Sequence, residues 1–265
     1  MPHVTVNGTS LYYESVGDGP EAVVFAHGGL LSGRMFDGVT PALRDRYRCV
    51  TFDFRGQGQS ALARTGYDMD TLADDTATLL RELGCGPCHF VGCSMGGFVG
   101  MRLAVERPEL LRSLTLIGTS ASPEPHKLQF RTLGWMASLF GCRVVTRWVM
   151  PVQFGPAFLK DSARAEVRNL WRERIASNSR RGSVRAAGGV IDRPYYSGQL
   201  SRIRTPTLIV VGDDDRATPP AESAELHAAI PGSRLVVVPE AGHAVPIEDP
   251  AEVTAAVSRF LDEQG

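Results

Sequence analysis

The sequence predicts an α/β fold, in which a mostly parallel eight-stranded sheet is flanked by helices and carries an inserted helical cap. Three observations support this prediction. Short apolar runs alternate with longer helical patterns, the runs are apolar throughout, and the alternation stops between about residues 121 and 200. Uniformly apolar runs are typical of strands that are covered on both faces, as in a parallel sheet between layers of helices.

The expected strands begin with an antiparallel pair. Residues 4–6 and 11–16 flank Asn7-Gly8, a pair that tolerates the positive φ angles of a tight hairpin turn. Two later segments, 70–83 and 249–261, place apolar residues on one helical face, which predicts helices that cover the sheet. The other six expected strands are the apolar runs at 22–26, 49–52, 89–92, 114–117, 207–211 and 235–238.

The segment 121–200 contains no run typical of a strand, and glycine and proline interrupt its helix-like stretches. It is therefore predicted to be an inserted helical cap, or lid, while residues 1–120 and 201–265 form the core. All three tryptophans of the chain lie in the cap segment. Because a cap that covers a site also lines its pocket, we expect pocket residues from both parts. They are Trp135 and Trp148 from the cap, and Leu30 and Val245 from the core.

Composition limits the classes of partner. The 265 residues are 43% hydrophobic and 22% charged, as in an ordinary globular protein. The formal net charge of -1 provides no overall field that would attract nucleic acid or an anionic membrane surface. We therefore expect a small-molecule partner rather than nucleic acid or a membrane, and the sequence is compatible with a homodimer.

The N-terminal residues run directly into strand-like sequence, without the basic and apolar regions of a secretion signal. No apolar run approaches the ~20 residues that are needed to span a bilayer. The five cysteines are an odd number, which fits reduced thiols better than a disulfide framework. These features predict a cytoplasmic protein.

Ser94 is the predicted nucleophile. It follows the apolar run at 89–92 and precedes a helical pattern that begins near Met95, so the Gly-x-Ser-x-Gly segment from Gly92 to Gly96 falls at a strand-to-helix turn. Such a turn has strained backbone angles, and it requires the flanking glycines because strand and helix approach closely there. A nucleophilic serine therefore explains the segment better than an ordinary tight turn does.

A serine hydroxyl needs an adjacent base, which in this order of elements is a histidine after the last strand. His243 follows the run at 235–238 and is the predicted base. The histidine in turn needs a carboxylate that holds one tautomer, and this acid is expected after the preceding strand. The residues alone leave three consecutive aspartates open at that place: Asp213, Asp214 and Asp215.

Two backbone N–H groups are needed to bind the negative oxygen of a tetrahedral intermediate. The first is expected from Met95, at the start of the helix that follows Ser94. The second is expected from the glycine-rich turn after the run at 22–26, where Gly29 is the best candidate. His27, in the same turn, is predicted to be structural.

The order of these motifs resembles that of the α/β-hydrolase superfamily along nearly the whole chain. The resemblance implies that Asp215 is the acid, because the family's acid stands three residues after the strand-ending glycine and four before a proline. The motifs are His27-Gly28-Gly29, Asp53-Phe54-Arg55-Gly56-Gln57-Gly58-Gln59-Ser60, Gly92-Cys93-Ser94-Met95-Gly96-Gly97, the segment from Gly212 to Pro219, and Gly242-His243.

Within the superfamily, the chain most resembles 3-oxoadipate enol-lactonases and related small carboxylesterases. This narrower resemblance rests on the segment from His89 to Gly97, on Arg107-Pro108-Glu109 and on Arg147-Trp148-Val149. It implies an ester or a lactone as the substrate.

The predicted function is that of a serine hydrolase that cleaves a small carboxylic ester or lactone through Ser94, His243 and Asp215. The reaction would proceed by way of an acyl-enzyme, with no metal and no organic cofactor. Two alternatives use the same triad, namely hydrolysis of a carbon–carbon bond in a diketone and peroxide formation by a perhydrolase. A third alternative is a ligand receptor of the same fold with little turnover, slower than about one per minute.

Two other patterns have a functional and a structural interpretation. Cys85-Gly86-Pro87-Cys88 spells a redox tetrapeptide, but it follows a helix and leads into a strand, the reverse of the order that activates a thiol. Coincidence is the favoured interpretation. The cap segment is rich in arginine. Most of these cations are expected on a solvated helical face, and the alternative is that they attract a substrate that carries a carboxylate.

Overall fold

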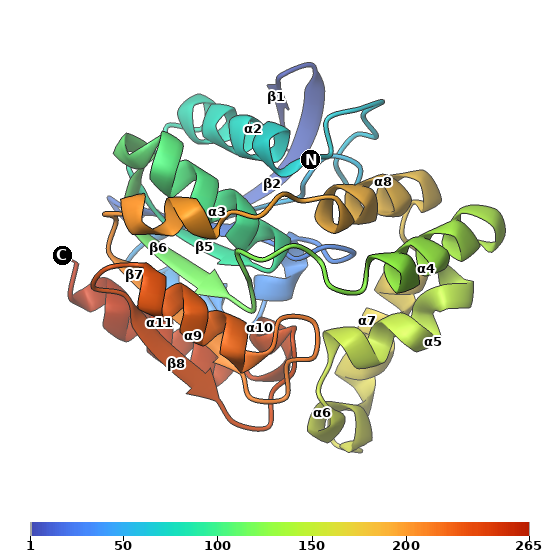
Figure 1. Ribbon diagram of the computed structural model, residues 1–265. Coiled ribbons are helices and arrows are strands. Elements are labelled where there is room, and N and C mark those ends of the chain that lie inside the picture. Colours follow the sequence, from blue (N-terminus) through green and yellow to red (C-terminus); the bar gives the residue numbers. More distant parts are fainter. Residues whose placement is uncertain (1, 265) are drawn as a thin grey trace.

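Eight strands form one sheet in the computed structural model, which describes residues 2–264 (Figure 1). The order across the sheet is β1-β2-β4-β3-β5-β6-β7-β8. The pairs β1–β2 and β2–β4 are antiparallel, and all other neighbours are parallel. The prediction of a mostly parallel eight-stranded sheet is confirmed. The strands are β1 (His3–Val6), β2 (Thr9–Val16), β3 (Ala22–Ala26), β4 (Arg48–Phe52), β5 (Cys88–Cys93), β6 (Leu111–Ile117), β7 (Thr207–Gly212) and β8 (Arg234–Val238).

Helices cover both faces of the sheet. Successive residues of β3 alternate between two apolar clusters, since Val24 belongs to one and Val23 and Phe25 belong to the other. The helices α2, α3 and α9 contribute to the first cluster, and α1 and α11 contribute to the second. The elements of this core are η1 (Gly33–Phe36), α1 (Thr40–Leu43), α2 (Met69–Glu82), α3 (Met95–Glu106), η2 (Pro108–Leu110), α9 (Pro220–Ala229), α10 (Val245–Glu248) and α11 (Pro250–Asp262).

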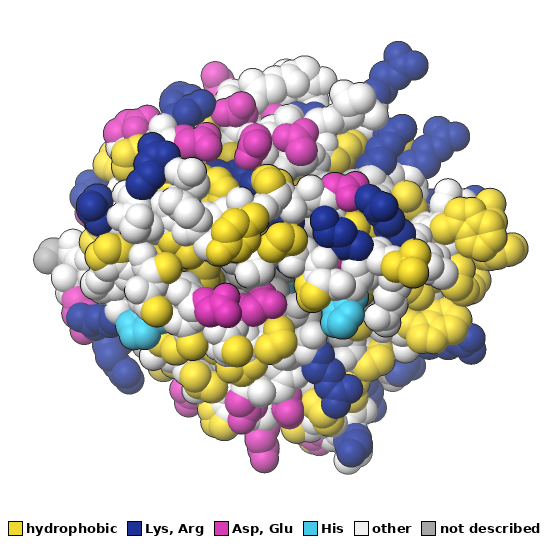
Figure 2. Space-filling model, viewed as in Figure 1, with side chains coloured by type: hydrophobic (Ala, Val, Ile, Leu, Met, Phe, Trp, Pro, Cys, Tyr) yellow, Lys and Arg dark blue, Asp and Glu magenta, His cyan; other side chains and the backbone are white. Residues whose placement is uncertain are grey.

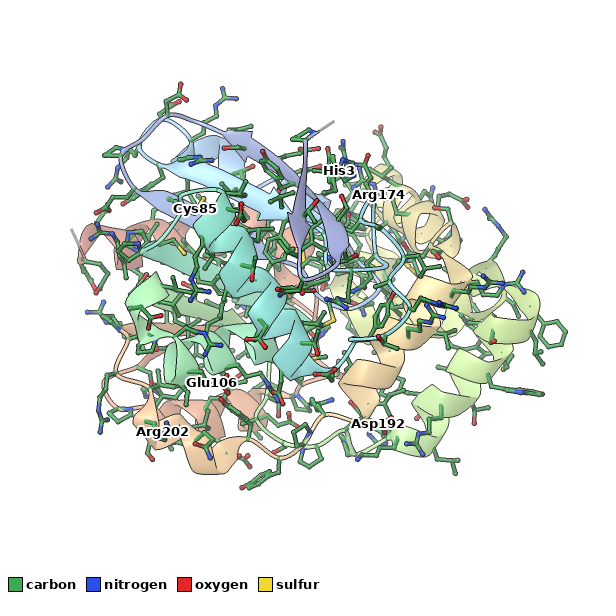
Figure 3. All side chains as sticks on the ribbon, turned by 90° about the horizontal axis from the view of Figure 1, so that it is seen from above. His3, Cys85, Glu106, Arg174, Asp192 and Arg202 are labelled. Atoms are coloured by element: carbon green, nitrogen blue, oxygen red, sulfur yellow. The ribbon has the colours of Figure 1, made fainter. Side chains whose placement is uncertain are left out.

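A helical insertion separates β6 from β7. Its helices lie together at one side of the sheet in two perpendicular views (Figures 1 and 3), and Asp192 directly follows the last of them. The next element, η3 (Ser197–Arg202), contributes Leu200 to the first apolar cluster. The end of the predicted cap segment 121–200 therefore packs with the core helices. The helices of the insertion are α4 (Lys127–Phe140), α5 (Cys142–Gln153), α6 (Pro156–Lys160), α7 (Ala165–Ala176) and α8 (Arg180–Ile191).

The parallel strands determine where functional side chains can meet. Because the carboxyl ends of neighbouring parallel strands lie at one edge of a sheet, the residues that follow β3, β5, β7 and β8 are brought to the same edge. Gly29, Ser94, Asp215 and His243 each follow one of these strands.

Candidate active site

Ser94 lies at the sharp turn between β5 and α3, with φ 49° and ψ -109°. A positive φ is strained for a residue other than glycine. Its main chain is held by hydrogen bonds, because Ser94 N donates to Ile117 O at 2.8 Å and Ser94 O accepts from Thr119 Oγ1 at 2.9 Å. The strain is therefore imposed by the surrounding structure, which presents the hydroxyl at the edge of the sheet.

The glycines on either side of Ser94 permit a close approach of strand, helix and neighbouring strand. A Cβ atom on Gly92 would lie 2.3 Å from Gly96 O, and one on Gly96 would lie 2.1 Å from Ala26 O. Both separations are far below van der Waals contact with backbone atoms. The Gly-x-Ser-x-Gly segment thus has the local geometry that the sequence predicted for it.

The His243 ring is held by one of the three aspartates. Its Nδ1 atom lies 2.9 Å from Asp215 Oδ2 and 3.1 Å from Oδ1. Because a carboxylate only accepts, Nδ1 carries the hydrogen, which leaves Nε2 as the basic nitrogen. Asp213 and Asp214 are exposed, whereas Asp215 is buried. The geometry therefore selects Asp215 as the partner of His243.

Thr218 completes the surroundings of the Asp215 carboxylate. The N–H groups of Ala217 and Thr218 donate to Oδ1 at 2.8 and 2.9 Å, and Thr218 Oγ1 donates to Oδ2 at 2.9 Å. Such donors stabilise the ionised form of a buried carboxyl. No sequence pattern singled out Thr218, although it stands within the motif that ends at Pro219.

The pKa values of the pair shift apart. Burial raises the pKa of Asp215, but the charge and the hydrogen bond of His243 and the donors of Thr218 outweigh it and hold that pKa below its ordinary value. Burial lowers the pKa of His243, but the charge and hydrogen bond of Asp215 outweigh it and raise that pKa. These shifts favour an ionised Asp215 carboxylate, which stabilises the protonated form of the His243 imidazole.

The loop after β3 lies against Ser94, since a Cβ atom on Gly28 would lie 3.4 Å from Ser94 Cβ. In the described part of the chain, the N–H groups of Gly29 and Met95 donate to no protein acceptor. The adjacent Leu30 N–H is already bound, by Gln57 Oε1 at 2.9 Å. Gly29 and Met95 are therefore the backbone donors that remain available for an oxyanion next to Ser94.

His27 shapes this loop. Its Nε2 accepts from Phe54 N at 3.0 Å, so Nδ1 carries the hydrogen and donates to Gly28 O at 2.7 Å. The ring is fully buried, and burial lowers its pKa. These contacts are those of a structural residue, as predicted from the sequence.

A cavity of about 150 Å³ lies between the core and the insertion, and both Ser94 and His243 line it. Leu30, a predicted pocket residue, and Gly29, a predicted oxyanion donor, also line it. Most of the remaining lining is apolar and comes from the insertion. These apolar residues include Phe130, Leu133, Ala137, Val145, Val149, Val152, Ile175, Val184, Val190 and Ile191.

Three residues predicted to line the pocket are absent from the cavity lining. Trp135 and Trp148 lie on outward faces of α4 and α5, where they are 63% and 37% exposed. Figure 2 shows exposed hydrophobic side chains gathered at the side where these helices lie. Val245 is fully buried in the second apolar cluster. The inner faces of α4 and α5 contact the cavity through other residues.

A buried ion pair in the cavity lining was not predicted from the sequence. Arg193 Nη1 lies 3.3 Å from Glu124 Oε2, and both side chains are buried. Gln153 is another polar residue of the lining, and its buried Oε1 has no hydrogen-bond partner among the described residues. Arg193 and Glu124 are 69 positions apart, so no local sequence pattern indicated that they pair.

The other arginines of the insertion are mostly solvated. Arg143 pairs with Glu173, and Arg131 pairs with Asp192, all with side chains at least 59% exposed. The interpretation of the basic cap as a solvated surface is therefore favoured over attraction of a substrate carboxylate.

The cysteines show no sign of redox chemistry. In residues 2–264 all five thiols are buried and none is in a disulfide. Burial raises the pKa of both Cys85 and Cys88, the opposite of what a reactive thiolate requires. The structural interpretation of the tetrapeptide is supported.

Among the described residues, no helix is both long enough and apolar enough to cross a bilayer.

Known proteins share this fold and length. Residues 21–250 match a protein-family model described as alpha/beta hydrolase fold. RutD of Pseudomonas syringae, provisionally named a carbamate hydrolase, is 32% identical over 88% of this chain and 90% of its own. A thermophilic esterase from Thermogutta terrifontis is 30% identical, with a TM-score of 0.92 over 100% of this chain and 99% of its own. An enol-lactonase from Burkholderia xenovorans is 25% identical, with a TM-score of 0.92 over 98% of this chain and 100% of its own.

Proposed function

This chain belongs to the alpha/beta hydrolase family, and on that premise we propose that it is a serine hydrolase for a small carboxylic ester or lactone. One observation carries the proposal. A strained serine at a strand-to-helix turn and a histidine bound to a buried aspartate line the same cavity, next to two free backbone donors. Serine, base, acid and oxyanion donors are the parts that acyl transfer requires.

The first half of the reaction would form an acyl-enzyme. His243 Nε2 takes the proton of Ser94 Oγ as that oxygen bonds to the carbonyl carbon of the substrate. The carbonyl oxygen becomes negative and is stabilised by the N–H groups of Gly29 and Met95. The protonated ring, stabilised by Asp215, then gives its proton to the alcohol oxygen as the ester bond breaks.

The second half would restore the enzyme. Water enters, gives a proton to His243 Nε2 and attacks the acyl carbon, and the same donors bind the new oxyanion. The bond to Ser94 Oγ breaks as His243 returns the proton to Ser94, and the carboxylic acid leaves. Apart from the substrate and this water, the steps use only groups of the chain itself.

The cavity favours a neutral substrate with an apolar acyl or alcohol part. Its lining is mainly apolar, and its one arginine is neutralised by Glu124. An uncompensated charge on the substrate would lose its hydration without gaining a partner there. The similar structures named an esterase and an enol-lactonase agree with an ester or lactone of this kind. The insertion would act as the cap that excludes water from this cavity.

Turnover of p-nitrophenyl butyrate tests the proposal. We expect the purified protein to hydrolyse this ester and Ser94→Ala to lose at least about 1,000-fold in kcat. Ser122→Ala is the matched control, because Ser122 lies outside the cavity lining. Turnover below about one per minute on ester, lactone, diketone and peroxide-forming assays alike would instead favour the receptor alternative.

A further inference from the structure

A buried glutamate connects the main chain next to His243 to the insertion. Glu248 is the last residue of α10 and is 4% exposed. Its Oε2 atom accepts the N–H of Gly242 at 3.1 Å and the N–H of Gly155 at 2.8 Å. Gly242 directly precedes His243, and Gly155 stands between α5 and α6 of the insertion. One carboxylate oxygen therefore binds two chain segments that are 87 positions apart.

The two segments touch along their backbones. A Cβ atom on Gly242 would lie 2.2 Å from Gly155 N, so no other residue fits at Gly242 without displacing the insertion. On the far side of His243, Ala244 N donates to Gln153 O at 2.8 Å. The main chain thus meets residues 153–155 of the insertion on both sides of His243, by the close approach of Gly242 to Gly155 and by the hydrogen bond from Ala244.

This arrangement is costly, which indicates that it has a use. Oε1 of Glu248 is buried and has no partner among the described residues, and an unpaired buried polar atom costs free energy. Burial raises the pKa of Glu248 to about 7, although the N–H groups of Gly155 and Gly242 oppose the rise. A glutamine or an alanine would avoid the buried charge. The nearby imidazole of His243 is a group on which this charge acts.

Three charged groups lie around Glu248. His243 lowers its pKa and Asp215 raises it, while the Arg164 guanidinium of the insertion donates to the Glu248 main-chain oxygen at 2.9 Å. In the other direction, after the larger effects of burial and Asp215, the charge of Glu248 raises the pKa of His243, as does that of Glu124. The charges of Glu248 and His243 therefore act on each other: each favours the charged form of the other.

We propose, on the basis of the serine hydrolase function inferred above, that Glu248 is a positioning residue for His243. It fixes the main chain before the imidazole against the insertion, and its charge stabilises the protonated ring after Ser94 has given up its proton. Glu248 does not line the cavity and acts only through His243. The position of the His243 base therefore depends on the contact between the insertion and the core.

Two variants distinguish the effect of the Glu248 hydrogen bonds to Gly242 and Gly155 from the effect of its charge. Glu248→Gln keeps the size and one acceptor oxygen but removes the charge, whereas Glu248→Ala removes both. Glu252→Gln is the matched control, because it makes the same charge change at an exposed position of α11 four residues later. All three are compared with the natural chain by thermal unfolding, by the pH profile of kcat/KM on p-nitrophenyl butyrate, and by NMR titration of the His243 ring.

We expect Glu248→Gln to lower the His243 pKa and to move the acid limb of kcat/KM to lower pH. Glu248→Ala should also lower kcat by about 10- to 100-fold with little change in KM, because the base is misplaced while the cavity remains. Glu252→Gln should change neither quantity.

An unchanged His243 titration and acid limb in Glu248→Gln would overturn the role of the charge. A Glu248→Ala variant that loses thermal stability but keeps kcat would overturn the positioning role and leave a purely structural one. If Glu248→Ala does not fold, the His243 titration and the acid limb of Glu248→Gln decide whether Glu248 acts on His243. The NMR titration needs no turnover, so it tests Glu248 even if Ser94→Ala shows that the proposed function is wrong.

Discussion

Nδ1 of His243 lies 2.9 Å from Oδ2 of Asp215, and their side chains are 4% and 0% exposed. At this burial the hydrogen bond is protected from water, so it is strong and fixes the ring tautomer. We predict that Asp215→Asn lowers kcat by about 1,000- to 10,000-fold, because an amide can present its N–H to Nδ1 and stabilise the wrong tautomer. The control is Asp214→Asn, an exposed neighbour that does not contact the ring. Steady-state kinetics on one ester compares them, and equal activity of the two variants would remove Asp215 from the mechanism.

The pH dependence of the reaction follows from the raised pKa of His243. The base must be neutral to accept the proton of Ser94, so kcat/KM falls as pH decreases through the His243 pKa. Because Asp215 raises that pKa, we predict an acid limb centred above ~6.5, the ordinary value for histidine. A kcat/KM profile between about pH 4 and 10 measures it. A limb centred below the ordinary histidine value would show that the environment of His243 differs from the one described.

The close approach at Gly96 should be essential for folding. A Cβ atom there would lie 2.1 Å from Ala26 O, a backbone atom that cannot rotate away. We predict that Gly96→Ala lowers the free energy of unfolding by about 3 kcal/mol or more. Gly188→Ala is the matched control within α8, because nothing lies within 4 Å of the added Cβ atom. This control should stabilise the protein by up to about 1 kcal/mol through helix propensity. Urea unfolding distinguishes these results, and equal stability of both variants would contradict the predicted clash.

The buried pair of Arg193 and Glu124 should determine whether the cavity binds a neutral or an anionic substrate. Glu124→Gln leaves the Arg193 guanidinium buried without its partner, which we expect to cost about 3 to 5 kcal/mol of stability. It should also lower KM for a monosuccinate ester relative to the matched neutral butyrate ester, because the free cation can then bind the substrate carboxylate. The natural chain should prefer the neutral ester by at least about tenfold. A natural preference for the monosuccinate ester would mean that the pair opens to admit an anion.

Much of the fold was predictable because the local patterns and the topology agree. Uniformly apolar runs indicated buried parallel strands, and the positions after β5 and β8 brought Ser94 and His243 to one edge of the sheet. The choice among three aspartates needed either the family resemblance or the structure, because sequence spacing does not show that Asp215 is buried and its neighbours are exposed.

The cap was less predictable because its helices are apolar on more than one face. On α4, Leu133 and Ala137 contact the cavity while Trp135 and Leu139 face solvent. Composition alone cannot distinguish these faces, so Trp135 and Trp148 were predicted on the pocket side although they face outward. The Glu248 contact was also inaccessible to sequence analysis, since it joins Gly242 to Gly155 across 87 positions.

Covalent labelling tests the role of Ser94 most directly. The protein is treated with a fluorophosphonate, which reacts with activated serines, and is then analysed by intact mass and peptide mass spectrometry. We predict one adduct per chain, located on Ser94, absent from Ser94→Ala and strongly reduced in His243→Ala. Ester turnover should be lost in step with the labelling. A chain that stays unlabelled, or that is labelled at another serine while Ser94→Ala retains full turnover, would contradict the assignment of Ser94 as the nucleophile.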